Sequence, residues 1–143
     1  MKKIFMAALI LFLTLINVQA SAQIDYGTSK IYTREDMNAA IVLIKNQFSQ
    51  WKGCKLRNIR YAGDGCNSAE NIRWLNEIGN TGIVGGDCEK KYVEVMEFLS
   101  DFYASKDVKK YGLTFNPDFE YKDWQWWLAR TEGGDWELVS WGY

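Results

Sequence analysis

The sequence predicts an α+β fold in which a curved antiparallel sheet wraps around a long N-terminal amphipathic helix. Two observations support this prediction. A capped helical stripe of apolar residues begins at Thr33, and two alternating, tryptophan-rich segments joined by a glycine pair end the chain. The predicted order of elements is helix, strand, helix and then three strands, which is typical of an α+β domain.

The first helix has a start signal and a continuous apolar face. Thr33 is a favoured N-cap residue, and Asp36 lies three positions later, where a capping-box acid belongs. The apolar residues that follow are spaced by three and four, which places them on one side of a helix. They are Met37, Ala40, Ile41, Ile44, Phe48 and Trp51. Gly53 follows Lys52 and is expected to stop the helix.

Three further elements are predicted in the middle of the chain. Residues 54–61 alternate between apolar and polar and then change phase, which predicts a strand with a bulge. A short helix is expected to open at Asn67 and to close at Gly79. Residues 91–103 fit both a helical face and a strand, and their valine and aromatic content favours the strand.

The C-terminal segments predict a hairpin. Residues 124–131 and 136–143 alternate, and the glycines at 133 and 134 allow the backbone torsions of a tight turn between them. One face of the first strand is expected to carry Trp124, Trp126, Leu128 and Arg130. In the second strand, Trp136, Leu138 and Ser140 are expected to lie on the face opposite Glu137, Val139 and Trp141.

Residues 1–22 have the three parts of a secretory signal peptide. Lys2 and Lys3 precede an apolar run over residues 4–18, and small residues follow at positions 20–22. The run is shorter than the roughly 20 residues that a transmembrane helix needs. We therefore expect the segment to be removed, leaving a periplasmic or secreted protein that is not held in a membrane.

Cleavage after Ala22 fits the small-residue pattern best, and cleavage after Ala20 is the alternative. Residues 23–31 are then expected to be a flexible N-terminal segment, and residues 32–143 to form a single domain. Without Lys2 and Lys3, 15 basic residues remain against 18 acidic ones, a net charge of −3. This mildly acidic balance, without a basic stretch, argues against nucleic acid as a partner.

The three cysteines remain after cleavage, and an oxidising compartment favours a disulfide. Cys66 and Cys88 both follow glycine-rich loops, and we predict that these two pair. Cys54 begins a predicted strand and is expected to be a buried thiol.

The composition narrows the possible chemistry. The chain has no histidine, which removes the usual general base and a common zinc ligand. Oxygen-bearing side chains gather near one loop, but without the spacing of a calcium loop. They are Asp64, Asn67, Glu70 and Asp87. We predict no metal and no cofactor.

Two residue groups could still form a site. Asp101 could act as a buried base with Tyr61 or Tyr103 as proton donor, although an ion pair between Asp101 and Arg130 across the sheet is the favoured interpretation. Five tryptophans between positions 124 and 141 could stack on a sugar or an apolar ligand, although core packing is the more common use of such a cluster.

Several segments together resemble an uncharacterised family of exported bacterial proteins in the nuclear transport factor 2-like, cystatin-like cone superfamily. They are Tyr32 to Met37, Phe48 to Cys54, Leu56 to Tyr61, Ser100 to Phe102, Trp124 to Arg130, Gly134 to Trp136 and Trp141 to Tyr143. The resemblance covers nearly all of the chain after the signal peptide. It implies a curved sheet with helices in its concavity, often around a pocket, and it implies no particular activity.

The sequence thus predicts an exported, non-catalytic domain that binds a small molecule or a protein. The expected ligand-binding residues are Asp101, Tyr103, Trp126 and Arg130. One alternative is a histidine-free lyase or isomerase with an Asp/Tyr pocket. Another is an inhibitor or immunity-like protein that acts through its surface.

Overall fold

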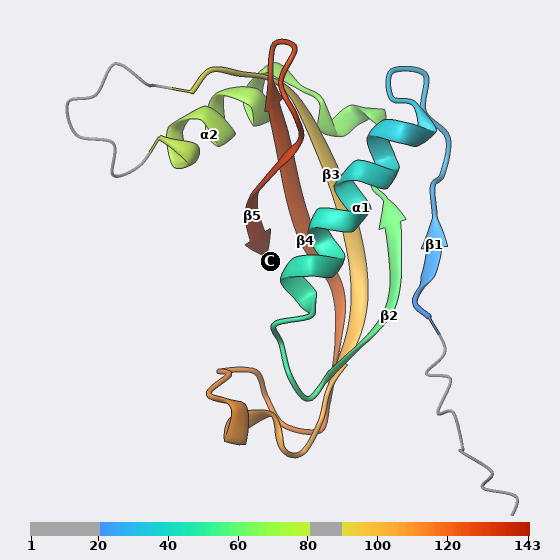
Figure 1. The fold of residues 1–143 in the computed structure, drawn as a ribbon, viewed down its shortest axis with the longest axis vertical. Helices are drawn as coiled ribbons and strands as arrows, with labels where there is room; N and C mark the ends of the chain where they lie inside the picture. Colours follow the sequence, from blue (N-terminus) through green and yellow to red (C-terminus); the bar gives the residue numbers. More distant parts are fainter. Residues whose placement is uncertain (1–20, 81–89) are drawn as a thin grey trace, which may run out of the picture.

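A computed structural model describes residues 21–80 and 90–143 (Figure 1). Within these residues the chain forms an α+β fold with a five-stranded mixed sheet, in the order β1-β2-β3-β4-β5, and two α-helices. The elements are β1 Gln23–Asp25, α1 Arg34–Phe48, β2 Cys54–Tyr61, α2 Ala69–Gly79, β3 Tyr92–Ala104, β4 Phe119–Thr131 and β5 Glu137–Gly142. No helix in the described residues is long and apolar enough to span a bilayer.

The first strand differs from the sequence prediction. Gln23–Asp25 forms β1 and pairs in parallel with β2, Gln23 lying opposite Asn58 and Asp25 opposite Arg60. The sheet is therefore mixed instead of wholly antiparallel, and part of the segment predicted to be flexible belongs to the sheet. A strand of three residues is too short to show an alternating pattern, because its position is set by backbone pairing with its neighbour.

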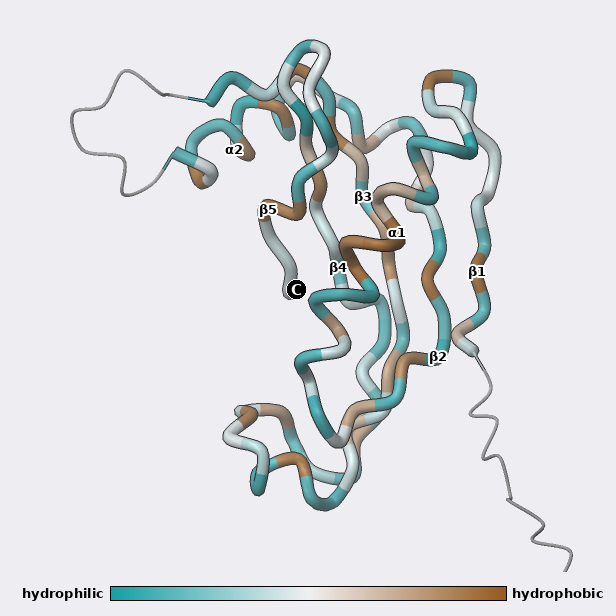
Figure 2. The backbone as a smooth tube through the Cα atoms, in the orientation of Figure 1, coloured by the Kyte–Doolittle hydropathy of each residue, from teal (hydrophilic) through white to brown (hydrophobic). Residues whose placement is uncertain are grey.

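The predicted capping box at the start of α1 is confirmed. The Asp36 amide donates to Thr33 Oγ1 at 3.2 Å, and the Thr33 amide donates to Asp36 Oδ2 at 3.1 Å. The helix ends at Phe48 and not at Lys52 as predicted. Gly53 instead forms the turn into β2 with a φ of 84°. In Figure 2, α1 alternates between hydrophobic and hydrophilic residues, as an amphipathic helix does.

The two helices pack on opposite faces of the sheet. The face that α1 covers, called the inner face here, holds most of the core, including Ile59, Phe98 and Leu128. The outer face is covered by α2 at one end, where Leu75 packs with Val95. Successive residues of a strand point to opposite faces of the sheet, so they pack in two different hydrophobic clusters.

The second helix is capped one residue later than predicted. Ser68 accepts a hydrogen bond from the Asn71 amide at 3.1 Å and is the N-cap of α2. Asn67 instead accepts the Val95 amide at 3.0 Å, which attaches the loop to β3. The competing interaction with the strand explains why the predicted cap at Asn67 is wrong.

The other strand predictions are confirmed with one change of face. Residues 92–104 form β3, β2 contains the expected bulge, and β4 and β5 form the C-terminal hairpin. In that hairpin Leu128 pairs with Leu138, but Trp126 pairs with Trp141, because Val139 is an extra residue in β5. This bulge turns Trp141 to the inner face, opposite to the side that simple alternation predicts.

Candidate functional site

The space between α1 and the sheet is filled by aromatic side chains. Phe98, Phe102 and Trp126 are completely buried. The Trp126 ring stacks on Trp51 with centroids 5.3 Å apart, and its Nε1 donates to Ser100 Oγ at 2.7 Å. Trp126, a predicted ligand-binding residue, therefore belongs to the core.

The four predicted ligand-binding residues do not form one site. Trp126 and Arg130 lie on the inner face of β4. Asp101 and Tyr103 alternate with the buried Phe102 along β3, so their side chains lie on the outer face. The sheet itself separates the two pairs.

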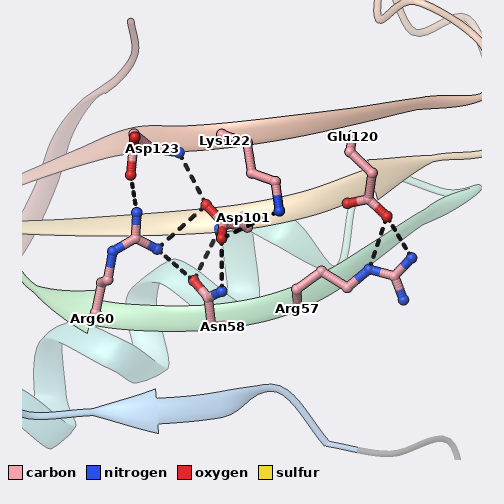
Figure 3. A network of polar contacts seen from close by, with 7 residues as sticks. All are labelled: Arg57, Asn58, Arg60, Asp101, Glu120, Lys122 and Asp123. Carbon is pink, nitrogen blue, oxygen red and sulfur yellow. Dashed lines mark hydrogen bonds and ion pairs between the residues drawn. The ribbon is translucent and has the colours of Figure 1, made fainter.

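Asp101 is the centre of a polar network on the outer face (Figure 3). Its Oδ2 accepts from the Asn58 side-chain amide at 2.9 Å, and its Oδ1 accepts from Arg60 at 3.3 Å and from the Asp123 amide at 3.0 Å. Lys122 Nζ lies 3.7 Å from Oδ2. The predicted pairing of Asp101 with Arg130 is wrong, because strand register places Asn58, and not Arg130, beside Asp101.

This network makes Asp101 a poor general base. Partial burial favours the neutral acid, but the Asn58 and Asp123 hydrogen bonds and the Arg60 guanidinium outweigh it and lower the pKa of Asp101 to about 2. The predicted rise in its pKa is therefore wrong. Asp123, whose amide donates to Asp101, lies in a bulge of β4. Its φ is 54°, a conformation that aspartate tolerates better than most residues.

The tyrosines proposed as proton donors are engaged elsewhere. The Tyr103 hydroxyl donates to Asp118 Oδ1 at 2.6 Å, and this hydrogen bond raises the pKa of Tyr103. The Tyr61 hydroxyl lies on the inner side and donates to Asp64 Oδ1 at 2.8 Å; burial is the main reason that its pKa is raised. Neither hydroxyl bonds to Asp101, so the Asp/Tyr pair needed by the lyase or isomerase hypothesis is not assembled.

Sequence reasoning missed Glu97, which lies on the outer face opposite Trp127. Burial raises the pKa of this carboxyl group. Among the described residues no hydrogen bond or ion pair is made by its side chain. A single acid of this kind does not by itself form a catalytic site.

Arg130 forms a second ion-pair cluster, between α1 and the hairpin. Its Nη1 lies 2.8 Å from Asp36 Oδ1, and its Nε bonds to Glu94. Trp136 donates to the same Asp36 oxygen at 3.2 Å, and its ring lies 4.6 Å from the Arg130 guanidinium carbon. An open groove of about 480 Å³ runs beside this cluster, with Val42 on its helical side. The partners of Arg130 in the protein leave it little capacity to bind a ligand.

Three aromatic residues remain exposed at the start of β4 and at the end of the chain, and we call them the C-terminal aromatic patch. Phe119, Trp141 and Tyr143 are 46%, 41% and 73% exposed. Tyr143 packs edge-on against Trp124 at a centroid distance of 5.0 Å, and Phe119 packs against Tyr121 at 5.0 Å. The patch is therefore a solvent-facing extension of the core.

The patch lies next to an edge of the sheet. β5 pairs with β4 and is the last strand in the sheet order, so no described strand lies along its other side. Trp141 belongs to this edge strand. Sequence alternation concealed the patch because it placed Trp141 on the face opposite Trp136 and Leu138.

The structure does not test the predicted disulfide between Cys66 and Cys88. Cys66 is a buried thiol 3.7 Å from the Val95 carbonyl oxygen, and Cys88 lies outside the described residues. Cys54 is a half-buried thiol, and burial raises its pKa to about 11, so it is protonated at neutral pH. The pairing of Cys66 with Cys88 stays a prediction.

The loop acids form no metal site in the described part of the chain. Asp64 is occupied by protein donors: Ser29 donates to its Oδ1 at 2.5 Å, and the Lys30 amide donates to its Oδ2 at 2.8 Å. These bonds hold the segment after β1 against the loop before α2. Asp87, the remaining acid of the predicted group, lies outside the described residues.

Comparisons with protein-family models, with curated proteins and with solved structures found no match to this chain.

Proposed function

We propose that this protein is an exported, non-catalytic binding domain that recognises a protein partner through the C-terminal aromatic patch. The observation that supports this best is the contrast between two sets of aromatic residues. Trp126 and its neighbours fill the interior completely, whereas Tyr143 remains 73% exposed. Exposed aromatic side chains bury a large area at low entropic cost, and they are frequent hot spots of protein interfaces.

The adjoining edge of the sheet favours a protein over a small molecule. An extended segment of a partner can add a strand beside β5 through main-chain hydrogen bonds. Trp141, within β5, would then contact side chains of the added strand. The bulge at Val139 and the Lys90–Glu137 ion pair make this edge less suited to non-specific pairing, which favours a selective partner.

An inhibitor or immunity-like role is a more specific form of this proposal. The patch is supported from below by packed rings, so a partner would meet a preorganised surface. Both forms use the same contact surface and differ only in whether the partner loses activity in the complex. An activity assay of the identified partner, with and without an equimolar amount of this protein, separates them.

We also propose that the fold is a variant of the nuclear transport factor 2-like, cystatin-like cone. In its support, the long strands β3 and β4 curve around α1 in Figure 1. The parallel strand β1 and the filled concavity are departures from a pocket-bearing member. An experimental structure in which α1 leaves the concave face would contradict the assignment.

Site-specific photo-crosslinking tests the partner surface. A benzophenone amino acid replaces Tyr143 in bacteria that make the full chain, and irradiation is expected to give a discrete adduct with one protein. The same replacement at Tyr111, which is 53% exposed in the connection between β3 and β4, serves as the matched control and should give none.

A second variant shows whether the patch causes the contact. Trp141→Ser in the Tyr143-labelled chain should remove the adduct while the circular dichroism spectrum stays the same. Equal adducts from both labelled positions, or none from Tyr143, would contradict the proposal. The mass of the purified protein tests export, since a product that retains residues 1–22 would contradict it.

A further inference from the structure

A cleft lined by three lysines lies at the corner where α1 ends and β2 begins. Its volume is about 450 Å³ when Ser21 and Ala22 are present, since they form part of one wall; both stay in the exported protein when the signal peptide is cleaved after Ala20. Among the described residues, the charged side chains that line it are Lys45, Lys52 and Lys55, and none of the lining residues is acidic. In a chain with a formal net charge of −1, such a local excess of positive charge is notable.

The three lysines are not neutralised by the protein. In residues 21–80 and 90–143, none of their ammonium groups makes an ion pair or a side-chain hydrogen bond. The helix end does supply carbonyl groups, but turn amides already bind two of them: Ser49 N–H donates to Lys45 O at 2.9 Å and Trp51 N–H to Phe48 O at 2.9 Å. The ammonium groups therefore dominate the potential in the cleft.

The floor of the same cleft is apolar. Phe48, Trp51 and Leu56 line it as well, and the first two are part of the core and each 8% exposed. Cys54 also lines it, and its thiol is uncharged at neutral pH because burial raises its pKa to about 11. An apolar floor with a cationic rim matches a molecule that has a hydrocarbon body and an anionic head.

We propose that this cleft binds an anionic amphiphile with a single alkyl chain, its carboxylate held by Lys45, Lys52 and Lys55. The volume lies within the range of small-molecule sites, roughly 300–1,000 Å³. Lysine side chains can lay their methylene groups along an apolar tail and keep their ammonium groups at its head. The site shares no residue with the C-terminal aromatic patch and is independent of the proposed function.

Binding of dodecanoate, below its micelle concentration, tests the proposal on protein purified from cells that make the full chain. Calorimetry is expected to give one saturable site for dodecanoate and at least tenfold weaker binding of dodecanol, which has the same chain without the charge. Dodecyltrimethylammonium, with the opposite charge, should not bind. Raising the ionic strength should weaken dodecanoate binding, because exposed charges are screened.

Charge-matched variants locate the site. Changing Lys45, Lys52 and Lys55 together to Gln should weaken dodecanoate binding at least tenfold. The control changes Lys30, Lys91 and Lys106 to Gln; these have exposed or partly exposed side chains without ion pairs in the described chain, and they lie outside the cleft lining. The control protein has the same net charge and should bind dodecanoate as the parent does.

Modification of Cys54 by N-ethylmaleimide, read by peptide mass spectrometry, gives a second measurement. Bound dodecanoate should slow the reaction at least fivefold in the parent and leave the rate unchanged in the triple cleft variant. Equal dodecanoate affinity of the two triple variants, or equal affinity of the parent for dodecanoate and dodecanol, would overturn the proposal. Absence of saturable binding by the folded parent would overturn it as well.

Discussion

Replacing Asp101 with Asn should destabilise the protein in a manner that depends on pH. The carboxylate is 16% exposed and is bound by Asn58, Arg60 and the Asp123 amide. Its pKa of about 2 in the folded protein compares with an ordinary value of 3.8. That difference corresponds to about 2 kcal/mol of folding free energy above pH 5.

The sign follows from the direction of the pKa change. Because folding lowers the pKa of Asp101, its ionisation stabilises the protein above the unfolded-state pKa, and this contribution disappears as the pH falls through about 2. At pH 3 about 1 kcal/mol of it remains. Asp101→Asn should therefore cost about 2 kcal/mol at pH 7 and about 1 kcal/mol at pH 3.

Urea unfolding of the parent and the variant at both pH values measures this difference, since other titrating groups are common to the two proteins. Asp135→Asn is the matched control: Asp135 is exposed and makes no ion pair in the described structure, so its variant should track the parent at both pH values. A destabilisation by Asp101→Asn that is the same at pH 7 and pH 3 would refute the assignment of a low pKa to this network.

Three further substitutions test the packing of the fold by urea unfolding at pH 7. Thr33→Ala removes the N-cap of α1 and should lower the free energy of unfolding by about 1 kcal/mol, whereas Thr33→Ser should keep most of it. Ser100→Ala leaves the buried Trp126 Nε1 without its acceptor and should cost about 1–3 kcal/mol; no loss would mean that the indole finds another partner. Gly53→Ala places a Cβ atom on a residue with a φ of 84° and 3.0 Å from the Tyr111 ring, so it should lower the free energy of unfolding by more than about 1 kcal/mol. Gly65→Ala is its control and should be tolerated, because no heavy atom lies within 4 Å of the added Cβ.

The sequence predicted correctly those features that depend on residues close together in the chain. The capping box at Thr33 and Asp36 involves residues three apart, and the hairpin turn at Gly133 involves neighbours, so both can be recognised without knowing the fold. The partners of Asp101 could not be predicted in the same way. They depend on the register between β2, β3 and β4, which bulges in β2 and β4 shift by a residue.

The exposure of Phe119, at the start of the strand that holds the buried Trp126, depends on the relative lengths of elements. α1 has 15 residues and is about 22 Å long, whereas the 13 residues of β4 extend over about 43 Å. One helix therefore covers about half of the inner face. The connection from β3 to β4 covers some of the rest, since Phe115 packs on Trp51 and Trp124.

The sequence could not reveal this mismatch, because the predicted strand began at Trp124, and its eight residues extend over about 26 Å, close to the length of the helix. The structure starts β4 at Phe119, before a bulge that interrupts the alternation. The additional residues carry the strand beyond the end of α1. A partner that covers this uncovered end would complete the burial of the inner face, which is why the candidate interface lies at the C-terminal aromatic patch and not in the concavity.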